Sequence, residues 1–167
     1  MIRLPLFWRR HFLIVEGVLV IAATIGFGIW YFGFNGAAAT NAILKDNRAT
    51  LYGTMASIFG SLLGFAITAT SIVLGFSGSE RLGVVRASAQ YPMLWKTFSA
   101  TIRALALGTI VALLCLLVDR DSTPVRWLMV PLIFSVLLSV FRVARTIWVL
   151  EHIISLLTKP MRTEREP

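Results

Sequence analysis

The chain has 167 residues, of which 57% are hydrophobic and 14% are charged, and its mean hydropathy is +0.79. This composition is too apolar for a soluble globular domain and predicts an integral membrane protein. The net charge of +8 and the isoelectric point near 10.8 also occur in nucleic-acid-binding proteins. Here the basic residues flank apolar segments instead of gathering in a soluble region, so direct binding to nucleic acid is not expected.

The first apolar segment covers residues 12–34 and follows a basic stretch that contains Arg9 and Arg10. It is too long for the hydrophobic region of a signal peptide. It also ends in a group of aromatic residues that includes Trp30, and such groups are typical of a membrane interface. We therefore expect a retained first span, followed by an outer loop over residues 35–49.

The second predicted span covers residues 50–76, which carry no charge. A helix needs about 20 residues to cross the hydrocarbon core of a bilayer, so this segment is long enough. Small and hydroxyl-bearing residues recur along it at steps of three and four, which places them on one face of the helix. We call this face the small-residue seam. Its stepped members are Thr50, Thr54, Ser57, Ser61, Gly64, Thr68, Ser71 and Gly75, and Gly60 widens it on one side.

Two interpretations of the small-residue seam stay open. Small residues let the backbones of two membrane helices approach closely, so the seam is expected at a tight helix contact, with this span at the centre of a bundle. Alternatively, in an oligomer the seam faces a shared axis and its hydroxyl groups line a water-filled path.

Residues 77–97 form the longest polar stretch, which we predict to be a cytoplasmic loop. Leu and Val residues alternate there with Arg residues, in a pattern that predicts a short interfacial helix. Arg81, Arg86 and Lys96 make this loop the main candidate surface for a cytoplasmic protein partner.

The third and fourth spans are predicted at residues 98–118 and 127–150, joined by a tight outer turn. Residues 1–167 then form a single all-α membrane domain. Twelve of the 16 Lys and Arg residues lie near one set of span ends and four near the other. Because Lys and Arg are enriched in cytoplasmic loops, this asymmetry predicts that both termini are cytoplasmic.

Four charged residues fall inside the predicted spans, at a similar depth in the cytoplasmic half: Glu16, Arg103, Arg142 and Arg145. A lone charge in hydrocarbon is costly, so we expect Glu16 to pair with the arginines. One interpretation of this inner charge cluster is a structural clasp between spans, with the remaining arginines reaching toward lipid phosphates. The other is a positively charged vestibule, or a gate held by a breakable ion pair.

The sequence contains no recognisable catalytic chemistry. It has no metal-ligand spacing, no phosphate-binding glycine loop followed by Lys, and no nucleophile with a plausible His partner. His11 and His152 both lie near the inner interface, where border positions are common for His. We therefore expect no enzyme activity, no cofactor and no metal site. The lone Cys115 lies in an apolar run and is expected to be a small buried residue.

The small size, the four spans, the cytoplasmic termini and the near absence of soluble mass resemble the membrane subunits of bacterial anti-phage defence systems, such as the Kiwa membrane component. That resemblance is one of architecture, and it implies a homo-oligomeric assembly in the bacterial inner membrane that engages a cytoplasmic effector. Two functions follow as expectations. The first is a scaffold or sensor subunit with a basic inner face, and the second is a homo-oligomeric ion channel lined by the second span.

Overall fold

The computed structural model describes residues 6–76, 91–120 and 124–157, and these residues are almost entirely helical. In this part of the chain, four helices are long and apolar enough to cross a membrane. Their apolar windows are Ile14–Gly33, Arg48–Ile72, Trp95–Val118 and Arg126–Glu151. The prediction of an all-α, multi-pass membrane protein is therefore confirmed.

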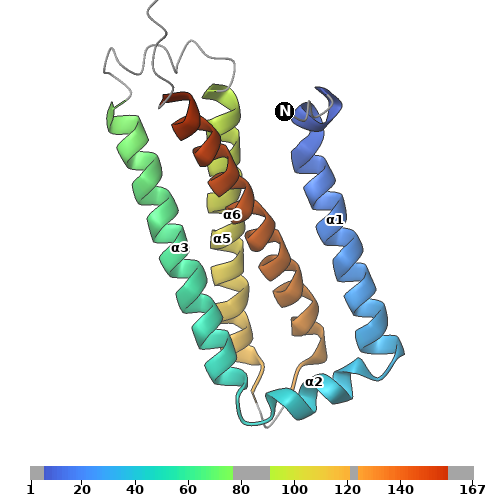
Figure 1. Cartoon of the computed structure of the whole chain (residues 1–167). Coiled ribbons are helices and arrows are strands. Elements are labelled where there is room, and N and C mark those ends of the chain that lie inside the picture. The colour runs from blue at the N-terminus through green and yellow to red at the C-terminus, as the bar shows by residue number, and fades with distance from the viewer. Residues whose placement is uncertain (1–5, 77–90, 121–123, 158–167) are drawn as a thin grey trace, which may run out of the picture.

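The helices run up and down the long axis of the molecule (Figure 1). The first, α1 (Leu6–Gly33), leads to a short helix, α2 (Gly36–Leu44), which lies across one end of the bundle. The chain returns through α3 (Arg48–Phe76), descends through α5 (Tyr91–Val118), and returns again through α6 (Met129–Leu157). We call the end where α1 begins and α6 ends the termini end, and the opposite end the α2 end.

The long helices form a row in which α5 and α6 are central. Helix α5 packs against α3 on one side and α6 on the other, and α1 packs against the far side of α6 (Figure 1). Within the Arg48–Ile72 window of α3, three residues are buried, against eight within the Trp95–Val118 window of α5. The expectation that the second span is the hub of the bundle is therefore wrong, because α3 stands at one edge of the row.

The segment that the sequence predicts to be a loop between the first two spans contains α2. Asn35 and Asp46 bracket this helix, and both adopt a left-handed backbone conformation with φ of 61° and 62°. Asn and Asp tolerate this conformation better than most residues, so they can make the two sharp changes of direction. Helix α5 also begins earlier than predicted, at Tyr91, and a short 3₁₀ helix, η2 (Arg126–Leu128), precedes α6.

The core lies between the four long helices and is richest toward the α2 end. Its buried residues include Tyr31, Tyr52, Leu105 and Met129. Cys115 is buried among them, which agrees with its predicted role as a small packed residue. A glycine also makes a close contact between α3 and α5 possible, because a Cβ on Gly108 would lie 3.0 Å from the ring of Phe59.

Candidate functional site

The small-residue seam lies on the outward face of α3. The opposite face carries the side chains that pack on α5, among them the buried Tyr52 and Phe59. Gly60 is half-buried, and the seam residues exposed at the surface of the chain are Thr50, Thr54, Ser57, Ser61, Gly64, Thr68 and Ser71. The surroundings of Gly75 lie outside the described residues. The seam is therefore not a contact between helices of the same chain.

The space in front of the seam is open. A Cβ built on Gly60 or Gly64 would meet nothing within 4 Å. Ser71 donates a hydrogen bond to the carbonyl oxygen of Ile67 at 2.9 Å, as hydroxyls of membrane helices often do. The side chains of Thr54, Ser57, Ser61 and Thr68 make no hydrogen bond within the described part of the chain. This face can therefore accept both a close helix backbone and hydrogen-bonding groups.

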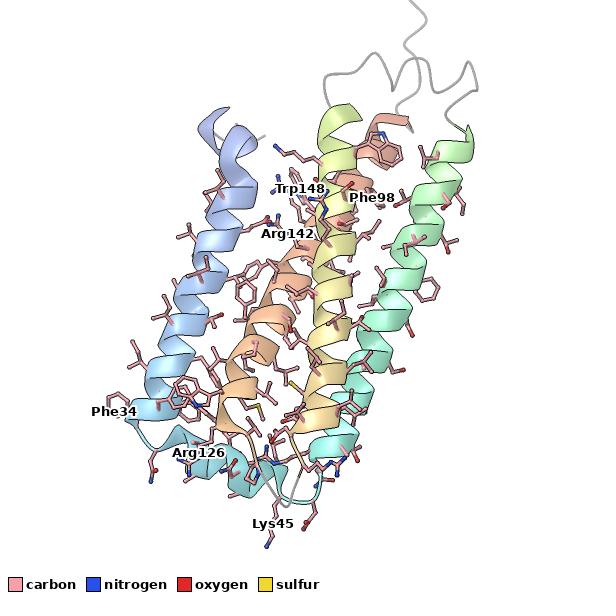
Figure 2. The ribbon with its side chains drawn as sticks, turned by 180° about the vertical axis from the view of Figure 1, so that it is seen from behind. Phe34, Lys45, Phe98, Arg126, Arg142 and Trp148 are labelled. Atoms are coloured by element: carbon pink, nitrogen blue, oxygen red, sulfur yellow. The ribbon has the colours of Figure 1, made fainter. Side chains whose placement is uncertain are left out.

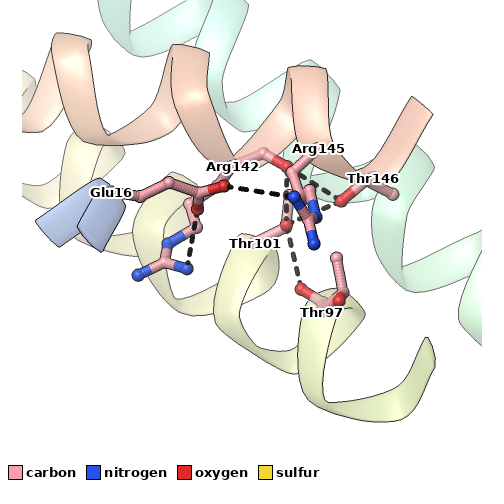
Figure 3. A network of polar contacts seen from close by, with 6 residues as sticks. All are labelled: Glu16, Thr97, Thr101, Arg142, Arg145 and Thr146. Carbon is pink, nitrogen blue, oxygen red and sulfur yellow. Dashed lines mark hydrogen bonds and ion pairs between the residues drawn. The ribbon is translucent and has the colours of Figure 1, made fainter. Parts of the chain in front are cut away.

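Three of the four charges predicted at the inner cluster come together between α1 and α6 (Figure 3). Glu16 Oε2 lies 3.2 Å from Arg142 Nη1, and Glu16 Oε1 lies 3.9 Å from Arg145 Nη1. The guanidinium group of Arg145 also lies 4.8 Å from the ring centre of Trp148, a cation–π distance. This arrangement ties α1 to α6 through charge pairing, as the depth argument predicts.

A hydroxyl pair fixes α6 on α5 at the same level. Thr101 Oγ1 lies 2.8 Å from Thr146 Oγ1 and 3.1 Å from the carbonyl oxygen of Arg142, and its single proton is also within reach of the carbonyl oxygen of Thr97 at 3.0 Å (Figure 3). The backbone that carries the arginine is therefore held by α5, while its side chain reaches toward α1. The inner charge cluster is thus continuous with the contact between the two central helices.

Arg103 does not join this cluster. It is exposed on α5 and forms no ion pair with any described residue, so its predicted pairing with Glu16 is wrong. A change of two positions along a helix turns a side chain by about 200°, and Thr101 already faces α6. Lys96, in the predicted partner face, is exposed near the termini end. Arg81 and Arg86 lie outside the described residues.

A second charge network, which the sequence reasoning missed, lies at the α2 end. Arg48 and Asp119 are only 4% and 2% exposed, and Arg48 Nη1 lies 2.5 Å from Asp119 Oδ2. Asp119 also accepts hydrogen bonds from the hydroxyl of Tyr52 and, at 2.6 Å, from the backbone N–H of Val125. Arg48 donates from its other terminal nitrogen to Asn41 Oδ1 on α2. One buried ion pair therefore joins α2, α3, α5 and the segment that leads into α6.

The signal for this outer network was present in the sequence. Arg48 directly precedes one apolar span and Asp119 directly follows another, at the same predicted end. At the inner end, the similar depths of Glu16 and the arginines predict that they pair. At the outer end, the similar depths of Arg48 and Asp119 predict a pair in the same way.

The described residues contain no group of three or more His, Cys, Asp or Glu that could hold a metal ion. What the arrangement provides chemically is two sets of charge-paired helix contacts and one outward face of small and hydroxyl-bearing residues. Comparison with protein-family models, with curated proteins and with solved structures finds no match to this chain.

Proposed function

We propose that this protein is a membrane scaffold or sensor subunit that assembles with copies of itself through α3 and engages a cytoplasmic partner through a basic inner face. The observation that carries the proposal is the exposure of the small-residue seam. Lipid is as apolar as a leucine side chain, so helices in a bilayer associate through close packing and hydrogen bonds, and small residues favour both. A helix face in contact with lipid alone would have no such use for Thr54, Ser57, Ser61 and Gly64.

The proposed orientation has the termini end on the cytoplasmic side of a bacterial inner membrane, and the enrichment of Lys and Arg near that end supports the cytoplasmic side. Exposed Lys96 near this end, together with Arg81 and Arg86 in the adjoining segment, supports an electrostatic surface for a protein partner. Charge complementarity mainly sets the rate and specificity of such an encounter. The resemblance in architecture to anti-phage membrane subunits is compatible with a cytoplasmic effector as that partner.

The second candidate function is a homo-oligomeric ion channel. It is favoured by the hydroxyl groups of Thr54, Ser57, Ser61 and Thr68, which make no hydrogen bond within the described residues and would line the axis of a ring built around α3. Both candidates bring the seams of several copies together. In the scaffold the seams pack against one another, and in the channel they face a shared axis and line a water-filled path.

Cysteine chemistry tests whether the seams come together and separates the two candidates. In a chain with Cys115 replaced by Ala, we expect Ser61→Cys to form crosslinked dimers in native membranes, because equivalent seam positions meet between parallel copies. Ile21→Cys, at an exposed position of α1, is the matched control and should not crosslink. A scaffold contact predicts that Ser61→Cys resists a water-soluble thiol reagent, whereas a channel predicts rapid reaction. Equal crosslinking at positions 61 and 21 would contradict both.

A further inference from the structure

The rim of the α2 end carries a group of exposed aromatic side chains. Trp127 on η2 is 74% exposed, and Phe34, which follows α1, is 75% exposed. Trp30 and Phe32, in the last turn of α1, are each 45% exposed. Figure 2 shows Phe34 pointing sideways, away from the helices. These residues lie at the level where the apolar window of α1 ends and that of α6 begins.

The position of Trp127 is fixed by the packing around it. Its ring centre lies 4.7 Å from that of Phe32, which joins η2 to the end of α1. The start of η2 is fixed in turn, because the N–H of Val125 donates to the buried carboxylate of Asp119. Trp127 is therefore joined to the end of α1 through its ring and to Asp119 through the backbone that leads into η2.

A basic residue precedes Trp127 in η2, at the same end of the molecule as this aromatic pair. This residue, Arg126, is exposed. Lys45, after α2, is also exposed and points off the end of the molecule (Figure 2). Asp46 is exposed beside Lys45 and offsets the positive charge of that residue. Arg126 has no ion pair within the described residues, so its positive charge is the less compensated of the two.

We propose that Arg126, Trp127 and Phe32 form a binding site for the phosphate group of a membrane phospholipid in the leaflet at the α2 end. Trp is favoured at the boundary between hydrocarbon and headgroups, because its ring is apolar and its N–H donates a hydrogen bond. A guanidinium group matches a phosphate with two parallel N–H donors, so Arg126 would hold the headgroup while Trp127 and Phe32 contact the glycerol and upper acyl region. This proposal does not depend on which side of the membrane the α2 end faces.

Native mass spectrometry of the full chain in detergent tests the site with two probe lipids of equal acyl chains, phosphatidylglycerol and a galactolipid that lacks phosphate. Near a membrane surface one Arg contributes about 1 kcal/mol, so Arg126→Gln should lower the retention of phosphatidylglycerol about fivefold and leave the galactolipid unchanged. Lys45→Gln is the matched control, because Lys45 is also an exposed cation of the α2 end but points off the end of the molecule beside Asp46 (Figure 2). Equal losses in both variants, or equal wild-type retention of both lipids, would overturn the proposal.

Fluorescence quenching provides a second measurement that does not depend on Arg126. A variant that keeps only Trp127, with Phe at positions 8, 30, 95 and 148, is reconstituted in vesicles whose lipids carry bromine at different depths. We expect quenching at least twofold stronger with bromine near the glycerol than at the chain ends. Stronger quenching from the bilayer centre would overturn the placement of the site.

Discussion

Asp119 is the single residue on which most of the α2 end depends. Its buried carboxylate forms an ion pair with Arg48 of α3. It also accepts hydrogen bonds from Tyr52 of α3 and from Val125 in the segment before η2. Arg48 extends the same network to Asn41 on α2. Because a buried charge that loses its partner is far more costly than a buried pair, these contacts are expected to act as a unit.

We predict that Asp119→Asn lowers the free energy of unfolding by about 3–5 kcal/mol, since it leaves the guanidinium of Arg48 buried without its countercharge. Thermal unfolding in detergent measures the loss. The control is Asp46→Asn, an exposed acidic residue at the same end, which should change the stability by less than about 0.5 kcal/mol. Equal and small effects of both substitutions would contradict a buried ion pair.

A double-mutant cycle tests the inner charge cluster. Glu16→Ala and Arg142→Ala remove partners that lie 3.2 Å apart, so we expect a coupling free energy of about 1 kcal/mol between them. The same cycle with Arg103→Ala should give coupling below about 0.5 kcal/mol, since Arg103 is exposed and forms no ion pair within the described residues. Similar coupling with both arginines would mean that Glu16 senses only the general positive charge of the inner half.

The two networks differ in how far the sequence could predict them. Glu16 stands alone inside an apolar run, so its need for a partner is visible, and two of its three candidate arginines do lie beside it. The depth of Arg103 was correct, but depth along a helix does not fix direction around it. Arg48 and Asp119 lie at span boundaries, where a charge is ordinarily solvated, so the sequence shows that they share an end but not that they are buried.

At the scale of elements, the contact between α3 and α5 depends on Gly108. A Cβ there would meet three atoms of the Phe59 ring at 3.0–3.3 Å, and Phe59 is buried. We predict that Gly108→Leu lowers the free energy of unfolding by about 3 kcal/mol, because an overpacked contact forces the two helices apart. Thermal unfolding in detergent is again the measurement.

Gly26→Leu is the matched control for that substitution, because a Cβ on Gly26 of α1 would meet nothing within 4 Å. It should leave stability within about 0.5 kcal/mol of the wild type or raise it slightly, since Gly is a poor helix former. The double variant Phe59→Ala with Gly108→Leu should recover part of the loss. An unchanged loss in the double variant would contradict the contact.

Hydropathy and length were sufficient to predict the four long helices, because a run of about 20 apolar residues has few alternatives. They were not sufficient for α2, whose nine residues are too few for a clear periodic pattern. Nor could the seam on α3 show which helix it meets. Small residues indicate a close contact, and the sequence alone does not distinguish a neighbour in the same chain from one in another copy.

At the scale of the whole molecule, the row of helices leaves α3 with one packed face and one open face. The packed face is apolar and aromatic, and the open face carries the small-residue seam. Such a division fits a subunit of a larger membrane assembly, in which the fold of the monomer and the contact between copies use different residues. Substitutions in the seam should therefore affect assembly without affecting the fold.

The most direct test of this account is the mass of the assembly, measured by native mass spectrometry after extraction in a mild detergent, for the wild type, Gly64→Leu and Gly26→Leu. Both glycines have open space around them in the monomer, so neither substitution should unfold it. We predict that the wild type and Gly26→Leu are oligomers and that Gly64→Leu is a folded single chain with unchanged melting behaviour. A wild type that is a single chain at every concentration, or a Gly64→Leu oligomer of the same mass, would contradict assembly through α3.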